Sequence, residues 1–174
     1  FLDDWVLVHE LGHLLHPLGM STMFFLLKPY GDASKAALTM GLTYQQVAIL
    51  PIIGVGAAAL TMTGQNFGAK KMDRIHSLML RSVGFAVGLL SCVMLLFIGF
   101  RESFVRVFSE SSEVIAIGKN LLLISSLGFP VIGSRLVHAS IFQGLGMGVK
   151  ALLLNLSQML CFSLPLAWLL SRFF

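Results

Sequence analysis

Apolar residues run along this chain in five long blocks, which short polar stretches separate. A helix needs about 20 apolar residues to cross the hydrocarbon core of a bilayer. Blocks of this length without strict alternation are not typical of barrel strands, so helices are the expected spanning elements. The pattern therefore predicts an all-α, polytopic membrane helix bundle with about five transmembrane helices. The expected helices cover residues 5–27, 36–62, 82–100, 114–142 and 151–170.

Three local features refine this pattern. Gly128 and Pro130 stand in the middle of the fourth block and predict a break or bend, because proline removes a helical hydrogen bond. Residues 101–113 mix Phe and Val with charged residues, which is typical of an interfacial helix or loop. Gly84 and Gly88 have the small-xxx-small spacing that is typical of close helix packing in membranes.

The composition fits a bilayer rather than water as the solvent. The chain is 56% hydrophobic and 11% charged, whereas a soluble domain has about 25% charged residues. The net charge of +4 indicates loop charges that face lipid headgroups, and the absence of a basic-aromatic patch argues against nucleic acid as a partner. The chain begins at Phe1 and ends at Phe174 in an apolar run, so we expect a piece of a longer protein.

Basic residues are spread over both sides of the expected bundle. The densest cluster is Lys70, Lys71 and Arg74, directly after the second block. Because loops on the cytoplasmic side carry an excess of lysine and arginine, this cluster favours the cytoplasmic side for its loop.

Polar side chains inside apolar blocks are costly, so each is a candidate for a site that binds a substrate or an ion. Arg135 and His138 lie about one turn apart after the Gly128 break, and pairing within the bundle is the alternative for them. The glutamines could equally hydrogen-bond between helices. The candidates for a substrate or ion cavity are His16, Gln45, Gln46, Arg135, His138 and Gln143.

The first block contains His9-Glu10-Leu11-Gly12-His13, the H-E-x-x-H pattern of zinc proteases. On a helix the two histidines share one face, and the glutamate could activate a zinc-bound water. The alternative hypothesis is therefore an intramembrane zinc metalloprotease. Such a site needs a third ligand, typically a carboxylate, and no later apolar block carries an acid. We therefore expect no metal, no cofactor and no enzymatic activity.

One motif is more specific than these patterns. Gly64-Gln65-Asn66-Phe67-Gly68-Ala69 resembles the signature that closes a helix in MATE (multidrug and toxin extrusion) transporters. Other segments resemble the same family in the expected order over residues 17–174. They are Pro29-Tyr30-Gly31-Asp32, Pro51-Ile52-Ile53-Gly54, Phe108-Ser109-Glu110, Phe142-Gln143-Gly144-Leu145-Gly146 and Leu164-Pro165-Leu166.

The resemblance implies a single partial lobe, residues 1–174, from the C-terminal half of a twelve-helix transporter built of two six-helix lobes. It implies a multi-pass protein of the cell membrane that exports amphipathic organic cations in exchange for Na⁺ or H⁺. The N-terminal lobe of the same protein is the implied partner. A lipid or oligosaccharide flippase of the same fold is the alternative.

The chain departs from the family at two positions. Many sodium-coupled members carry acids in the first and fourth helices of this lobe, and these positions fall on His16 and Ile132. Ion coupling is therefore expected either in the missing half or through titration of His16.

Overall fold

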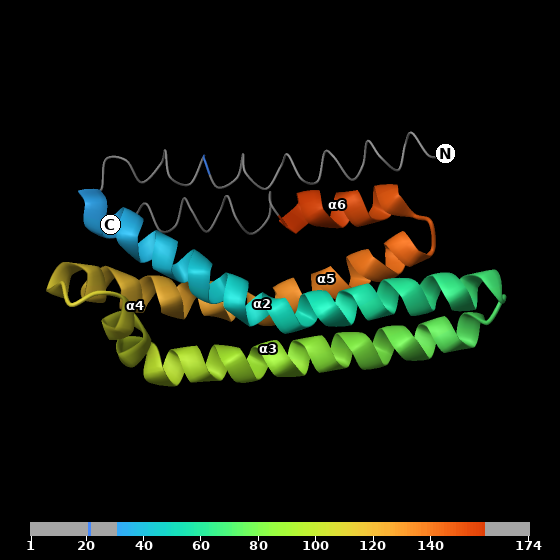
Figure 1. Ribbon diagram of the computed structural model, residues 1–174, viewed down its shortest axis with the longest axis horizontal. Coiled ribbons are helices and arrows are strands. Elements are labelled where there is room, and N and C mark those ends of the chain that lie inside the picture. The colour runs from blue at the N-terminus through green and yellow to red at the C-terminus, as the bar shows by residue number, and fades with distance from the viewer. Residues whose placement is uncertain (1–20, 22–30, 159–174) are drawn as a thin grey trace.

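A computed structural model describes Ser21 and residues 31–158 of the chain. Over residues 31–158 it contains five helices and no strand, which confirms the expected all-α class (Figure 1). The first expected helix, residues 5–27, and the end of the fifth lie outside the described residues. The helices are α2 (Gly31–Gly68), α3 (Met72–Phe108), α4 (Ser112–Leu127), α5 (Phe129–Gly144) and α6 (Gly148–Gln158).

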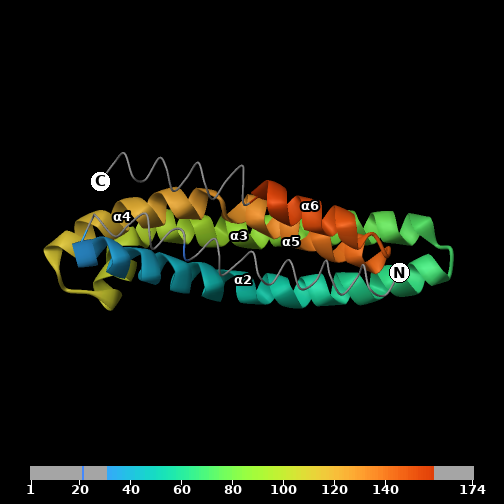
Figure 2. The ribbon, with the colours of Figure 1, turned by 90° about the horizontal axis from the view of Figure 1, so that it is seen from above.

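The helices form an up-and-down bundle along one long axis. α2 and α3 lie side by side and run in opposite directions, joined by a short turn, and α6 folds back along α5 (Figure 1). Gly56 contacts Ser140 and Gly144 contacts Thr63, so α5 runs in the same direction as α2. Figure 2 shows α4 and α5 following one another along the bundle, as two parts of one path.

The long helices have the dimensions of membrane spans. α2 has 38 residues and α3 has 37, and both are apolar enough to cross a bilayer. α4 and α5 together form a third span if their bent pair is taken as one. At 1.5 Å per residue, α2 extends for about 57 Å, longer than a hydrocarbon core of about 30 Å. Its ends therefore extend beyond the core, and α2 exceeds the expected 36–62 on both sides.

The amphipathic stretch after the third block is mainly helix. Residues 101–108 continue α3 beyond Phe100, whose backbone (φ −114°, ψ 20°) is not helical. Tyr44 of α2 donates a hydrogen bond of 2.8 Å from its hydroxyl to the carbonyl of Phe104. This bond ties the segment after the kink to the neighbouring helix.

The fourth expected helix is broken at Gly128, beside Pro130, where the sequence predicted a break. α4 ends at Leu127, α5 begins at Phe129, and the two helices are bent by 43°. Pro130 stands in the first turn of α5, where its missing N–H leaves no helical acceptor unpaired. The predicted break is confirmed.

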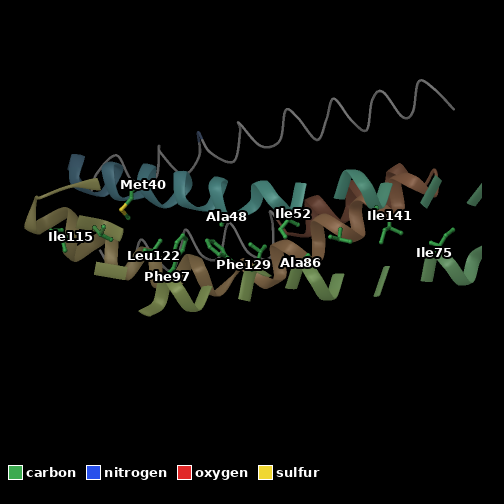
Figure 3. Packing of buried hydrophobic residues seen from close by; sticks show 14 residues of the cluster. Met40, Ala48, Ile52, Ile75, Ala86, Phe97, Ile115, Leu122, Phe129 and Ile141 are labelled. Carbon is green, nitrogen blue, oxygen red and sulfur yellow. The ribbon is translucent and has the colours of Figure 1, made fainter. Parts of the chain in front are cut away.

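Apolar side chains from four helices meet along the middle of the bundle (Figure 3). Phe129, at the start of α5, is 1% exposed and lies 5.7 Å from the ring of Phe97 in an edge-to-face arrangement. Phe97 in turn contacts Phe104 and Tyr44. The break between α4 and α5 therefore stands against an aromatic cluster that joins α2, α3 and α5.

Glycines set the closest helix contacts, but not all are the expected ones. A Cβ added at Gly133 would lie 2.8 Å from Leu90 Cδ1 and 3.1 Å from the Ala86 carbonyl oxygen, so α5 approaches α3 there. A Cβ at Gly84 or Gly88 would meet no described atom within 4 Å. Within the described residues, the small-residue contact of α3 is therefore made by Ala86 and not by that pair.

Candidate functional site

The motif Gly64-Gln65-Asn66-Phe67-Gly68-Ala69 forms the end of α2. The backbone N–H of Lys71 bonds to the carbonyl of Asn66 at 2.9 Å, and that of Lys70 to the carbonyl of Phe67 at 3.0 Å. These two bonds define a Schellman cap, whose turning residue adopts a left-handed conformation. Lys70 occupies that position with φ 57°. The motif thus ends the helix and places the basic cluster just beyond it.

The end of α5 repeats this arrangement. The N–H of Met147 bonds to the carbonyl of Phe142 at 2.8 Å, and that of Gly146 to the carbonyl of Gln143 at 2.9 Å. Gly146 has φ 74°, the conformation that glycine adopts without steric cost. The segment Gln143-Gly144-Leu145-Gly146 is therefore a second helix-closing motif.

The two motifs lie next to each other in space. A Cβ at Gly64 would lie 3.7 Å from the Gly144 carbonyl oxygen, and one at Gly144 would lie 2.7 Å from the Leu60 carbonyl oxygen. Two motifs that are far apart in the sequence therefore close neighbouring helices at the same end of the bundle.

A polar group lies between α5 and α6. Arg135 is half-buried, and its Nη1 donates a hydrogen bond to Oδ1 of Asn155 on α6. Its Nε is buried and has no hydrogen-bond partner among the described residues. Arg135 lies about 13 Å along the axis from the end of α5 at Gly144. A charged guanidinium is thus held well inside a membrane helix.

His138 stands one turn after Arg135 and bonds within its own helix. Its Nδ1 lies 2.7 Å from the Ser134 carbonyl oxygen and 3.3 Å from the Ser134 hydroxyl. A bond from Nδ1–H to that carbonyl leaves Nε2 as an acceptor in the neutral ring. The structure thus places His138 beside Arg135 on one face of α5.

The other candidates are not joined to this group. Gln45 is half-buried and Gln46 exposed on α2, and Gln143 is half-buried at the end of α5. Over residues 31–158, no hydrogen bond connects these glutamines with Arg135 or His138. His16, like His9, Glu10 and His13, lies outside the described residues. In the part that the structure describes, no group of His, Cys, Asp or Glu could hold a metal.

Asn155 was not expected at the site. It interrupts an apolar block, and burying a lone amide in a membrane is costly, so that interruption is the signal that could have identified it. The described acids all lie outside the Arg135 group, in the first turns of helices, in a loop, or near the end of α3. They are Asp32, Asp73, Glu102, Glu110 and Glu113.

Glu102 belongs to an ion cluster near the end of α3. Its carboxylate accepts hydrogen bonds from Arg106 at 2.8 Å and from Lys119 of α4 at 3.3 Å. These exposed pairs contribute little stability each, about 0–1 kcal/mol. The cluster links α3 to α4 and satisfies the charge of Glu102 locally.

Comparison with known proteins connects this bundle and its two motifs to a family. The family model MatE matches residues 12–169. The chain belongs to the MatE family. A solved MATE structure in complex with MaL6 superposes with a TM-score of 0.72 over 93% of this chain and 38% of that chain, at 23% identity. That likeness shows that this MatE chain shares the fold.

Two curated relatives match most of the MatE chain. The probable multidrug resistance protein NorM of Bradyrhizobium diazoefficiens is 28% identical over 97% of the chain. A protein named FAD transporter, from Shewanella oneidensis, is 20% identical over 90% of the chain. The chain spans 39% of the length of the first relative and 35% of the second.

Proposed function

We propose that this chain forms one lobe of a secondary active efflux transporter for amphipathic organic molecules, with organic cations as the expected class. The match to MatE over residues 12–169 carries the proposal, on a bundle with two or three membrane spans. One relative is named for multidrug resistance and another for FAD, so the relatives' names already cover chemically different molecules. The proposed location is the cell membrane, and the proposed role is transport without enzymatic activity.

A second lobe is part of the proposal. The chain spans 39% of the NorM relative, and transporters with internal repeats place the substrate between two lobes that move against each other. α2 carries an exposed face that mixes small and polar residues with large apolar ones such as Leu50 and Ile53, and such a face can pack against a second membrane lobe. Its exposed members include Gln46, Gly54, Ala57, Ala58 and Thr61.

The coupling ion is proposed to be Na⁺ or H⁺, bound outside α5. Ile132 stands at the position where many sodium-coupled members carry an acid, and it packs against the apolar core. No described acid lies within the middle of a helix. The proposed coupling group is His16 or a residue of the other lobe, because the two positions that carry acids in many sodium-coupled members are His16 and Ile132 in this chain.

The proposal is tested by expressing the complete protein in bacterial cells that lack their own efflux pumps. Cells with the protein should accumulate less ethidium than vector controls, and a protonophore or removal of Na⁺ should abolish the difference. A protein that leaves ethidium accumulation unchanged but moves a fluorescent lipid across reconstituted vesicles would be a flippase of this fold. Unchanged ethidium, rhodamine and lipid movement would reject the proposal.

A further inference from the structure

The guanidinium of Arg135 offers an unused pair of donors. Nη1 is bonded to Asn155, whereas Nε is buried without a partner, and no hydrogen bond uses Nη2 among the described residues. Nε and Nη2 point to the same side of the planar group, so they form one edge that matches two oxygens of a carboxylate or phosphate.

The charge of Arg135 has no counter-charge among the described residues. α5 packs on α3 where Gly133 meets Ala86. The acid of α3 on that side, Asp73, is more than three turns from Ala86, or about 20 Å along the helix. Glu102 is already paired with Arg106 and Lys119. His138, one turn away, adds no negative charge.

Buried charges in membrane segments are rare and are paired in most cases, because an unpaired charge there costs several kcal/mol. Arg135 is held by a neutral amide, which orients the guanidinium, and no described residue compensates its charge. The Nε and Nη2 edge has no acceptor among the described residues, and an anion that reaches this buried edge would supply the missing acceptor.

We propose that Arg135, oriented by Asn155, is a binding site for the carboxylate or phosphate group of the transported molecule. The site rests on the proposed transport function and refines it: the substrate carries an anionic group, besides any cationic or apolar part. Arg135 supplies two charge-assisted hydrogen bonds, and Asn155 acts as a positioning residue.

The test uses two fluorescent dyes that differ by one group. Rhodamine 110 carries a free carboxylate, and rhodamine 123 is its methyl ester. Binding of each dye to the purified full-length protein in nanodiscs is measured by fluorescence anisotropy. The expected result is affinity for rhodamine 110 that is about tenfold or more above that for rhodamine 123, the effect of one charge-assisted pair.

Two variants test whether the preference for rhodamine 110 over rhodamine 123 depends on Arg135 and Asn155. Arg135→Gln removes the charge, and Asn155→Asp supplies a carboxylate to the same Nη1 donor with almost no change in shape. Both should bring the affinity ratio of the two dyes close to one. Ser157→Asp, which adds the same charge at an exposed position of α6, is the matched control and should leave the ratio unchanged.

A ratio near one in the unmodified protein, or a preference for rhodamine 110 that persists in Asn155→Asp, would overturn the site. If Arg135→Gln does not fold, the affinity ratio of the two dyes in Asn155→Asp still decides whether Arg135 binds the carboxylate. Efflux of rhodamine 123 with an unchanged ratio in both variants would reject the anion site and keep the transport function. A ratio that depends on Arg135, without efflux of either dye, would support the anion site and reject the transport function.

Discussion

Gly144 lies against Thr63, so closely that a Cβ on the glycine would stand 2.8 Å from the threonine Cβ. Thr63 is fully buried, and it directly precedes the helix-closing motif of α2. Gly144 ends α5 and belongs to the second helix-closing motif. The contact therefore fixes the ends of two parallel helices relative to each other, at the side where the chain turns into its basic loop.

This contact predicts that Gly144→Val destabilises the protein. The added side chain would collide with the Leu60 carbonyl oxygen, which cannot move without bending α2, so we expect a loss of about 1–3 kcal/mol. Thermal unfolding of the full-length protein in detergent measures the change. Gly54→Ala is the control, because a Cβ there meets no described atom within 4 Å, and its unfolding temperature should not fall.

A second prediction concerns Lys70 and Gly146, the left-handed residues of the two helix caps. Substitutions at these two positions should change the stability of the protein in opposite directions. Lys70→Gly should stabilise the protein, because a non-glycine residue in the left-handed region costs about 1–2 kcal/mol. Glycine offsets part of this gain, because the greater entropy of its unfolded chain costs about 0.5–1 kcal/mol, so the net gain is between about 0 and 1.5 kcal/mol.

Gly146→Ala should lower stability by a similar amount, since the same reasoning applies in reverse and no atom crowds the site. The unfolding temperatures of the two variants should therefore move in opposite directions. Movement of both in the same direction would show that the loops, and not the backbone conformations, control the effect.

Local chemistry explains which parts of the fold could be predicted from the sequence. The break before α5 depends on Gly128 and Pro130, neighbours in the chain, so it was predictable. The motif from Gly64 to Ala69 likewise indicated where α2 closes, whereas the apolar block alone placed that end too early, at residue 62. Contacts between helices depend on their rotation and axial position, which apolar blocks leave open. For this reason Gly84 and Gly88 were expected at a contact that Ala86 makes instead with Gly133.

The candidate site follows the same division. Arg135 and His138 could be found as costly polar residues in an apolar block, and both lie on one face of α5. Asn155 interrupts an apolar block in the same way, but its pairing with Arg135 could not be predicted, because the turn between α5 and α6 brings the two residues together. The structure adds that Nη1 of Arg135 is bonded to Asn155, whereas Nε has no partner among the described residues.

A third prediction concerns the tie between Tyr44 and the kink at Phe100. Tyr44→Phe removes the hydrogen bond to the Phe104 carbonyl but keeps the ring contacts with Phe97 and Phe104. We expect a loss of about 1 kcal/mol, the net value of one such bond.

Thr61→Val serves as the comparison for Tyr44→Phe. Its hydroxyl bonds only within α2, to the Ala57 carbonyl, at an exposed position. Its removal should change the unfolding temperature less than Tyr44→Phe does. An equal or larger effect of Thr61→Val would contradict the role of the tyrosine bond.

A fourth prediction concerns His9-Glu10-Leu11-Gly12-His13, which lies outside the described residues. The acids among the described residues lie near helix ends or in a loop, so none of these is placed as a third ligand in the middle of a membrane helix. The purified full-length protein should contain far less than one zinc per molecule by atomic absorption. Stoichiometric zinc that is lost in His13→Ala, or proteolysis lost in Glu10→Gln, would support the protease instead.

The last prediction concerns the 174-residue chain expressed alone. Alternating access needs one lobe to move against another around a shared site. The chain spans 39% of the length of its NorM relative, and the exposed face of α2 carries polar groups such as Gln46 that would then face lipid. We expect no ethidium efflux above vector control from this piece, although the complete protein is active under the same conditions. Co-expression with the proposed second lobe should restore efflux if the two lobes assemble. Efflux by the piece alone would instead indicate that two copies of this chain supply both lobes.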